Sequence, residues 1–215
     1  MSQAKGPNFP IAVLISGTGT NLQALIDSVH QHDGIEIVAV ASSRADALGL
    51  ERARQAGIET AVFSANDYPS REQRDSELAA WLKERNTQLI VMAGFMELLT
   101  PLLLNQFPTR IINVHPALLP AFPGVRAIER QLEHGVKVGG VTVHFVDAGM
   151  DTGPIVLQEA IDVPYTRSQT EFESWLHKIE HRLLPKAVRL LAAGAVKINA
   201  DNARIVHVDK DALRK

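Results

Sequence analysis

Residues 110–124, RIINVHPALLPAFPG, decide the fold, and they place two polar side chains inside an apolar stretch. The β-branched beginning of this stretch predicts a buried strand. Because alternate residues of a strand share a face, Asn113 and His115 should point the same way. Pro116 disfavours helical geometry at His115 and keeps the strand extended. Local spacing equally allows the alternative that both side chains only cap the strand end and bond to backbone.

The prolines that follow shape the next part of the stretch. Pro120 and Pro123 postpone any helix until after Gly124. Residues 117–123 are therefore predicted to form a stiff apolar loop beside the polar pair. An amide and an imidazole at a strand end, covered by such a loop, indicate a functional site rather than a core alone.

Composition narrows the possible classes of protein. The chain has 215 residues, 46% of them hydrophobic, which suits one large domain or two small ones; we expect a single domain over residues 1–215. Its formal net charge is -2, so we expect no nucleic-acid or membrane partner. It has no cysteine, which excludes disulfides, thiolate nucleophiles and cysteine-bound zinc. With no apolar signal segment or membrane-spanning run, we expect a cytoplasmic protein, either a monomer or a homodimer.

Apolar runs alternate with amphipathic segments along the chain. The predicted strands are residues 11–15, 35–41, 60–63, 88–93, 110–115, 141–146 and 155–161. The predicted helices are residues 22–34, 45–56, 71–86, 96–106 with an interruption at Pro101, 126–133, and 170–193 with a kink or break near Pro185. This order predicts an α/β fold with a mainly parallel, twisted sheet and helices on both faces.

A glycine-rich turn, Ser16-Gly17-Thr18-Gly19-Thr20-Asn21, joins the first strand to the first helix. Glycines let backbone N–H groups approach an anion, and the helix N-terminus adds a favourable dipole, so Gly19, Thr20 and Asn21 are candidates for holding a phosphate. The alternative is a plain tight turn. Leu22 replaces the third glycine of a dinucleotide fingerprint. Parallel sheets bind ligands beyond the carboxyl ends of their strands, so this turn, residues 93–95 and the Asn113/His115 pair should share one crevice.

A second glycine-punctuated loop, residues 147–154, carries two carboxylates. Asp151 is the stronger candidate because Gly149 and Gly153 let the loop approach another backbone closely; the alternative is an aspartate that satisfies its own turn. His144 is interpreted as a satisfied polar residue on a half-exposed strand.

One helix carries a further polar group. His177, Glu180 and His181 lie beside one another on the helix of residues 170–193 and by themselves suggest a solvated face. Spacing gives no convincing metal site, so no metal is expected.

Taken together, these motifs resemble those of the phosphoribosylglycinamide formyltransferase family. The resemblance extends over residues 11–198 and rests on the following segments: ISGTGTNLQALID, ASSRADALGLERARQAGI, VMAGFMELLTP, RIINVHPALLPAFPG, GVTVHFVDAGMDTGPIVLQ and EHRLLP. It implies a Rossmann-like formyltransferase fold. It also implies transfer of a formyl group from 10-formyltetrahydrofolate, as co-substrate, to the amine of glycinamide ribonucleotide in purine biosynthesis.

The resemblance also assigns roles by position. Asn113, His115 and Asp151 match the family's catalytic residues, with the N-terminal half holding the phosphate and the C-terminal half the folate. Matches to substrate-contacting positions are Gly19, Thr20, Asn21, His177 and Glu180. Matches to folate-contacting positions are Arg71, Met96, Glu97, Leu98, Leu99, Asn113, Asp147, Ala148, Gly149, Met150 and Asp151. The sequence departs from the family at Glu97, where a basic residue is expected more often; that matters only if side-chain charge, rather than backbone, binds the folate.

The chemistry of these residue types agrees with formyl transfer. An amine that attacks a formyl carbon creates a tetrahedral oxyanion, which Asn113 and a protonated His115 could stabilise. Asp151 should favour the imidazolium and fix its orientation, and either Asp151 or a bound water should shuttle the proton. No covalent enzyme intermediate is needed.

Three other functions fit parts of the pattern. A formyltetrahydrofolate hydrolase should have a second histidine at Pro116 and an N-terminal regulatory domain. A methionyl-tRNA formyltransferase should have a further C-terminal domain and a basic surface. A non-catalytic nucleotide-binding module would leave Asn113, His115 and Asp151 unexplained.

Overall fold

The computed structural model describes residues 9–163 and 168–213. The chain divides into two compact units, Met1–Ile112 and Asn113–Lys215. The boundary falls inside the strand β5 (Ile111–His115), so the candidate polar pair begins the second unit. Each unit is described by itself.

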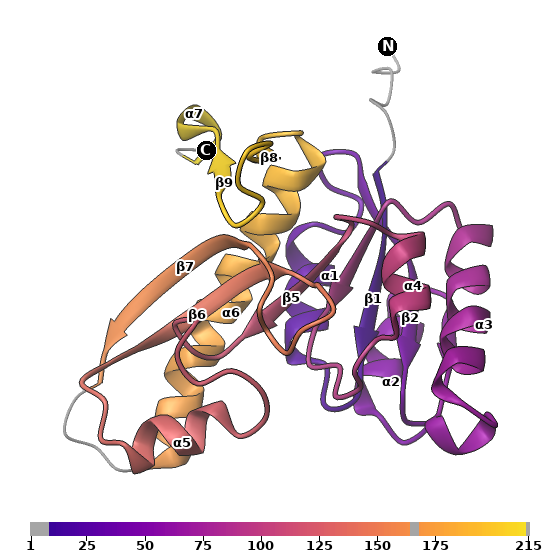
Figure 1. The fold of residues 1–215 in the computed structure, drawn as a ribbon. Coiled ribbons are helices and arrows are strands. Elements are labelled where there is room, and N and C mark those ends of the chain that lie inside the picture. The colour runs from indigo at the N-terminus through magenta and orange to yellow at the C-terminus, as the bar shows by residue number, and fades with distance from the viewer. Residues whose placement is uncertain (1–8, 164–167, 214–215) are drawn as a thin grey trace. The chain divides into compact units, whose positions relative to one another are not determined.

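The first unit is a parallel α/β layer. Its elements are β1 (Phe9–Ile15), α1 (Thr20–Ser28), β2 (Ile35–Ser42), α2 (Leu48–Gln55), β3 (Thr60–Val62), the 3-10 helix η1 (Ala65–Asp67), α3 (Arg71–Glu84), β4 (Leu89–Met92) and α4 (Pro101–Gln106) (Figure 1). β1 pairs in parallel with β2 and β4, and β2 pairs in parallel with β3. Almost every side chain of β1 and β4 is buried. Because successive side chains point to opposite faces, both faces of these strands are covered.

The second unit combines an antiparallel pair with one long helix. After β5 come α5 (Ala127–Glu133), β6 (Val138–Phe145), β7 (Ile155–Asp162), α6 (Gln169–Ala192), β8 (Val196–Ile198), β9 (Val206–Val208) and α7 (Lys210–Leu213). β6 and β7 are antiparallel, and α6 packs against both strands and against α5 (Figure 1). β8 and β9 form a separate antiparallel hairpin that contacts β7.

The mainly parallel α/β architecture confirms the predicted fold class. Two helices are capped at their N-termini, since the side chains of Ser70 and Ser168 accept hydrogen bonds from the backbone N–H groups of Gln73 and Glu171. The single domain over the whole chain stays a prediction.

Four predicted helices need correction. The helix expected over 22–34 spans only Thr20–Ser28, and His32 beyond it forms an isolated bridge with Ile35. Residues 96–100 are irregular, and the helix expected over 96–106 begins at Pro101, because proline suits the first helical position, where no N–H partner is required. α2 begins at Leu48, three residues later than predicted. α6 continues through Pro185 without a break, so packing on β6 and β7 outweighs the hydrogen bond that proline removes.

Candidate active site

The end of β5 presents Asn113 and His115 on one face, as predicted, because both side chains reach the same carboxylate of Asp151. His115 is 5% exposed. Its Nε2 lies 2.8 Å from the carbonyl oxygen of Phe122, inside the proline-rich loop that follows β5. The predicted loop therefore lies beside the pair and makes direct contact with the imidazole.

That loop is fixed by side chains of the second unit. Thr142 of β6 donates to the Ala117 carbonyl at 2.7 Å and accepts from the Leu119 N–H at 3.1 Å. Gln158 of β7 donates to the Leu119 carbonyl at 2.8 Å. The Phe122 carbonyl consequently belongs to a braced segment, and it orients the ring of His115.

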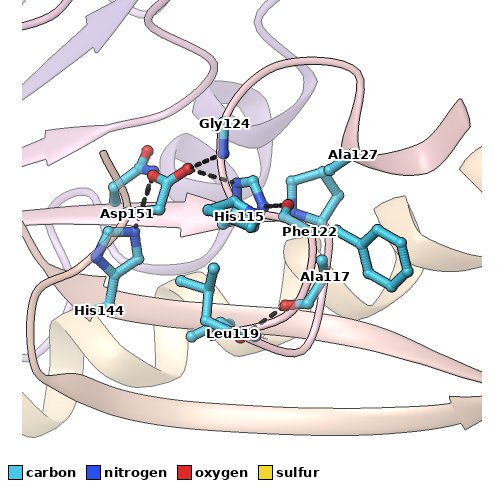
Figure 2. Close-up of polar contacts among 12 residues, drawn as sticks. His115, Ala117, Leu119, Phe122, Gly124, Ala127, His144 and Asp151 are labelled. Atoms are coloured by element: carbon cyan, nitrogen blue, oxygen red, sulfur yellow. Dashed lines mark hydrogen bonds and ion pairs between the residues drawn. The ribbon is translucent and has the colours of Figure 1, made fainter. Parts of the chain in front are cut away.

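Asp151 joins the loop after β6 to the end of β5. One carboxylate oxygen accepts the Gly124 N–H at 2.7 Å and lies 3.3 Å from Nδ1 of His115. The other oxygen lies 3.4 Å from Nδ2 of Asn113 and 3.5 Å from Nε2 of His144. Figure 2 shows the carboxylate between the two imidazoles. Asp151 therefore serves this group of four side chains, called here the Asp151 cluster, rather than its own turn.

The charge on the Asp151 cluster follows from burial and from these contacts. Burial alone would raise the pKa of Asp151, but hydrogen bonds from His144 and the Gly124 N–H, together with His115, lower that pKa to about 2. Burial lowers the pKa of His115 below 6.5, although Asp151 and the Phe122 carbonyl act to raise it. At neutral pH Asp151 is an anion, and the imidazolium of His115 is a minority form that Asp151 keeps accessible.

His144 was missed as a member of this site. It is 1% exposed rather than half-exposed, and its Nδ1 contacts the Phe145 carbonyl at 2.8 Å. Its Nε2 lies 3.3 Å from Nδ2 of Asn113. The alternation of Thr142 and His144 suggested a strand face that is open to water, but both side chains are buried.

The glycine-punctuated loop behaves largely as its sequence suggests. Asp147 caps its own turn, accepting the Gly149 N–H at 3.0 Å and the Thr152 hydroxyl at 2.6 Å. A Cβ at Gly153 would lie 1.8 Å from the Phe145 carbonyl oxygen, which confirms a close backbone approach. Ala148 and Met150 are exposed, and Met150 is available to a ligand.

The polar group on α6 is not a solvated face. Glu180 is 4% exposed and accepts from Nδ1 of His177 at 2.9 Å. This hydrogen bond raises the pKa of His177. His181 stacks on His177 with ring centroids 6.0 Å apart. Burial, and to a smaller extent the charge of His177, lowers the pKa of His181.

In the first unit the glycine turn has a conformation that depends on glycine. Gly19 has φ 72° and precedes α1, where no side chain caps the helix. A Cβ at Gly19 would lie 2.5 Å from the Cα of Gly49. Arg52 donates to the Thr18 carbonyl at 2.9 Å and fixes the turn from α2. Thr20 and Asn21 open the helix, so their N–H groups suit an anion.

The candidate folate segment also belongs to the first unit. Arg71 donates to the Leu98 carbonyl at 2.7 Å. The side chains of Met96 and Leu98 are exposed, whereas Leu99 is half-buried. Glu97 stands where a basic residue was expected more often. Its carboxylate forms an ion pair with Arg74 at 3.0 Å, so its negative charge is compensated within the protein. The shared crevice for all candidate sites stays a prediction.

The described part of the chain shows neither a metal site nor a membrane-spanning helix. Residues 9–163 and 168–213 contain no group of three or more histidine, cysteine or acidic side chains that could hold a metal ion. Over the same ranges, no helix is long and apolar enough to span a bilayer.

Comparisons with known proteins give the family. Residues 9–188 match the formyl transferase family. The phosphoribosylglycinamide formyltransferase of Haemophilus influenzae is 38% identical over 206 residues, which are 95% of this chain and 96% of that protein. The crystal structure of glycinamide ribonucleotide transformylase 1 from Symbiobacterium toebii is 45% identical with a TM-score of 0.90, covering 94% of this chain and 95% of that chain.

Other relatives are much longer. The trifunctional purine biosynthetic protein adenosine-3 of Drosophila pseudoobscura pseudoobscura is 43% identical over 209 residues, which are 96% of this chain but 15% of that protein. The match to the Haemophilus protein, in contrast, covers both chains almost completely. This chain belongs to the formyl transferase family and, within it, to the phosphoribosylglycinamide formyltransferases.

Proposed function

We propose that the protein transfers the formyl group of 10-formyltetrahydrofolate to the amine of glycinamide ribonucleotide in purine biosynthesis. Family membership supports the reaction class. The observation that carries the proposal is the Asp151 cluster: an ionised carboxylate between an amide, an imidazole and a second imidazole at one strand end.

The reaction needs charge stabilisation rather than a protein nucleophile. The amine nitrogen attacks the formyl carbon, and the carbonyl electron pair moves onto oxygen. The amine then loses a proton, the folate nitrogen gains one, and the carbon–nitrogen bond to the folate breaks as the carbonyl re-forms. Groups that bind the transient oxyanion and move one proton are sufficient for this sequence.

Asn113 and His115 are proposed to stabilise the oxyanion. The contacts of Asn113 Nδ2 within the free cluster are long, at 3.3 Å and 3.4 Å, so this N–H group can turn to a stronger acceptor when a ligand oxygen arrives. Both nitrogens of His115 face acceptors, the Phe122 carbonyl and Asp151. When the ring carries two protons, Nδ1–H can therefore donate to Asp151 and Nε2–H to the Phe122 carbonyl. If Nε2–H leaves the Phe122 carbonyl, it can donate to a ligand oxygen instead.

Asp151 is proposed to act mainly through its charge. A carboxyl group with a pKa of about 2 is a weak base, so it stores the amine proton poorly at neutral pH. The same charge stabilises a cationic attacking nitrogen and a protonated His115. The proton then travels by way of His115 or a water next to it.

Binding roles are proposed for both units. Gly19, Thr20 and Asn21 hold the substrate phosphate, and Glu180 with His177 contacts glycinamide ribonucleotide. The folate contacts are Arg71, Met96, Glu97, Leu98, Leu99, Asn113, Asp147, Ala148, Gly149, Met150 and Asp151. On this proposal the two halves act as one formyltransferase domain, with the phosphate bound by the N-terminal half and the folate contacted by residues of both halves. The cytoplasmic location and the monomeric or homodimeric state remain predictions.

The test is to mix the protein with 10-formyltetrahydrofolate, with and without glycinamide ribonucleotide, and to follow the release of tetrahydrofolate. The proposal expects release only when the ribonucleotide is present, in equal amount to formylated product. Release without the ribonucleotide would indicate a hydrolase. Binding without release in either mixture would indicate a non-catalytic nucleotide-binding module.

A further inference from the structure

A fully buried arginine lies in the first turn of α3. Arg74 and its neighbour Asp75 are both 0% exposed. Nε and Nη2 of Arg74 donate to one carboxylate oxygen of Asp75 at 3.0 Å and 2.8 Å. Burying a guanidinium is unfavourable unless its charge and its donors are satisfied. The other contacts of the guanidinium therefore indicate which part of the protein this buried charge stabilises.

The other side of the guanidinium points to the irregular segment of residues 96–100. Nη1 of Arg74 donates to Glu97 at 3.0 Å, and Nη2 approaches the Leu98 carbonyl at 3.4 Å. The second carboxylate oxygen of Asp75 accepts the Thr100 N–H at 2.6 Å. Arg74, Asp75 and Glu97, called here the Arg74 cluster, thus attach the segment to α3.

Two further contacts fix the same segment. The Met96 N–H donates to Oγ of Ser16, at the end of β1, at 2.9 Å. Arg71 donates to the Leu98 carbonyl. Backbone groups of an irregular segment have no helical or strand partners, so these side chains supply them. The segment is held at its beginning, its middle and its end.

The attachment leaves apolar side chains facing outward. Met96 is 72% exposed and Leu98 is 52% exposed. Large exposed apolar side chains on a braced segment are typical of a ligand surface. Glu97 lies between them, but its carboxylate is bound to Arg74, so the segment offers apolar groups and backbone rather than a free negative charge.

We infer that the Arg74 cluster positions residues 96–100 for the formyl-folate, and that Glu97 acts through Arg74 rather than by touching the ligand with its charge. Glu97 and Arg74 are on this account positioning residues. The inference rests on the proposed function, because it takes formyl-folate as the ligand of this segment.

The test variant is Glu97→Gln, which keeps the shape of the side chain and removes its charge. The expected result is a KM for 10-formyltetrahydrofolate raised about fivefold, with kcat and the KM for glycinamide ribonucleotide within about twofold of the parent. Hydrogen exchange of the amides of residues 96–100 in the free protein should be faster. Glu59→Gln is the matched control, because Glu59 pairs with Arg85 just after α3, and it should change neither readout.

A second pair of variants keeps the test independent of folding defects. Arg74→Met can prevent folding, so Arg74→Lys is compared alone and combined with Glu97→Gln. If the two residues act as one unit, the double variant should raise the KM for formyl-folate much less than the product of the single effects. Multiplicative effects would show that Glu97 does not act through Arg74, and would overturn the inference.

The two readouts separate the possible failures. Unchanged exchange and unchanged KM in Glu97→Gln would overturn the positioning role. Faster exchange with an unchanged KM for formyl-folate would also overturn the inference, because the segment would be held but not used for folate. A parent protein that releases no tetrahydrofolate with both substrates would instead contradict the proposed function, and the exchange measurement would still report on the attachment.

Discussion

Each unit contains a carboxylate bound by its neighbours, the fully buried Asp75 and the partly buried Asp151, and the partners of these two carboxylates differ in kind. Asp75 accepts from the guanidinium of Arg74 and from a backbone N–H, and arginine does not lose its proton in proteins. Asp151 faces two imidazoles, His115 and His144, and an imidazole, unlike a guanidinium, can either donate or accept a proton. The first arrangement can only hold a segment in place, whereas the second can change its charge during a reaction.

The comparison predicts that variants of the two clusters will differ in which kinetic constant they change. The largest effect is expected at Asn113 and His115. Replacing either by alanine should lower kcat about 100-fold or more, with little change in KM. The reason is that the lost hydrogen bond to the oxyanion forms in the transition state and not in the bound substrate. Steady-state kinetics with both substrates measures this. Turnover near that of the parent in both variants would remove the contrast with the Arg74 cluster.

A variant of Gly19 should give the next largest effect. Like the Glu97→Gln variant of the Arg74 cluster, it should change a KM rather than kcat. In Gly19→Ala the new Cβ would lie 2.5 Å from the Cα of Gly49, so the turn must shift, and the KM for glycinamide ribonucleotide should rise about tenfold. Gly57→Ala is the matched control, because Gly57 has the same φ of 72° but nothing within 4 Å of a new Cβ.

Titration calorimetry with each ligand separately decides what the Gly19 variant reports. Weaker binding of the ribonucleotide alone supports a phosphate role for the turn. Equal loss for both ligands, or the same loss in Gly57→Ala, would indicate a general defect of the fold instead.

A smaller effect is expected from the hairpin of β8 and β9. Arg204, in the connection between the two strands, donates to the carbonyl of Thr152 at 2.7 Å, and Thr152 follows Asp151 directly. Arg204→Met should lower kcat about twofold to threefold, since an exposed hydrogen bond contributes little. Lys197→Met removes an equal charge from the same hairpin and should have no effect. Equal rates for the two variants would show that the hairpin does not support Asp151.

Much of the site was predictable because its signals are local. The shared face of Asn113 and His115 follows from strand alternation over three residues, and the loop beside them follows from Pro120 and Pro123. The close approach of the loop that carries Asp151 follows from Gly153. The mainly parallel sheet follows in the same way from alternating apolar runs.

The missed features depend on contacts between distant residues. His144 is buried and contacts Asn113 and Asp151, which lie 31 and 7 positions away in the chain, and strand alternation alone does not show these contacts. The bond between Arg74 and Glu97 joins residues 23 positions apart. One signal was available: Arg74 falls on the same helical stripe as Leu78 and Leu82, both buried, so helical spacing could have flagged a buried arginine.

The central claim is that the charge of Asp151 keeps a protonated His115 accessible for formyl transfer, and the pH dependence of kcat in Asp151→Asn tests it most directly. Asp151 raises the pKa of His115 against burial, so removing the charge should lower that pKa further. A reaction that needs the imidazolium is lost as pH rises through this pKa. The alkaline limb of the variant should therefore move to lower pH, with the largest loss of rate on that side. A variant with the rate and the pH profile of the parent would contradict the account.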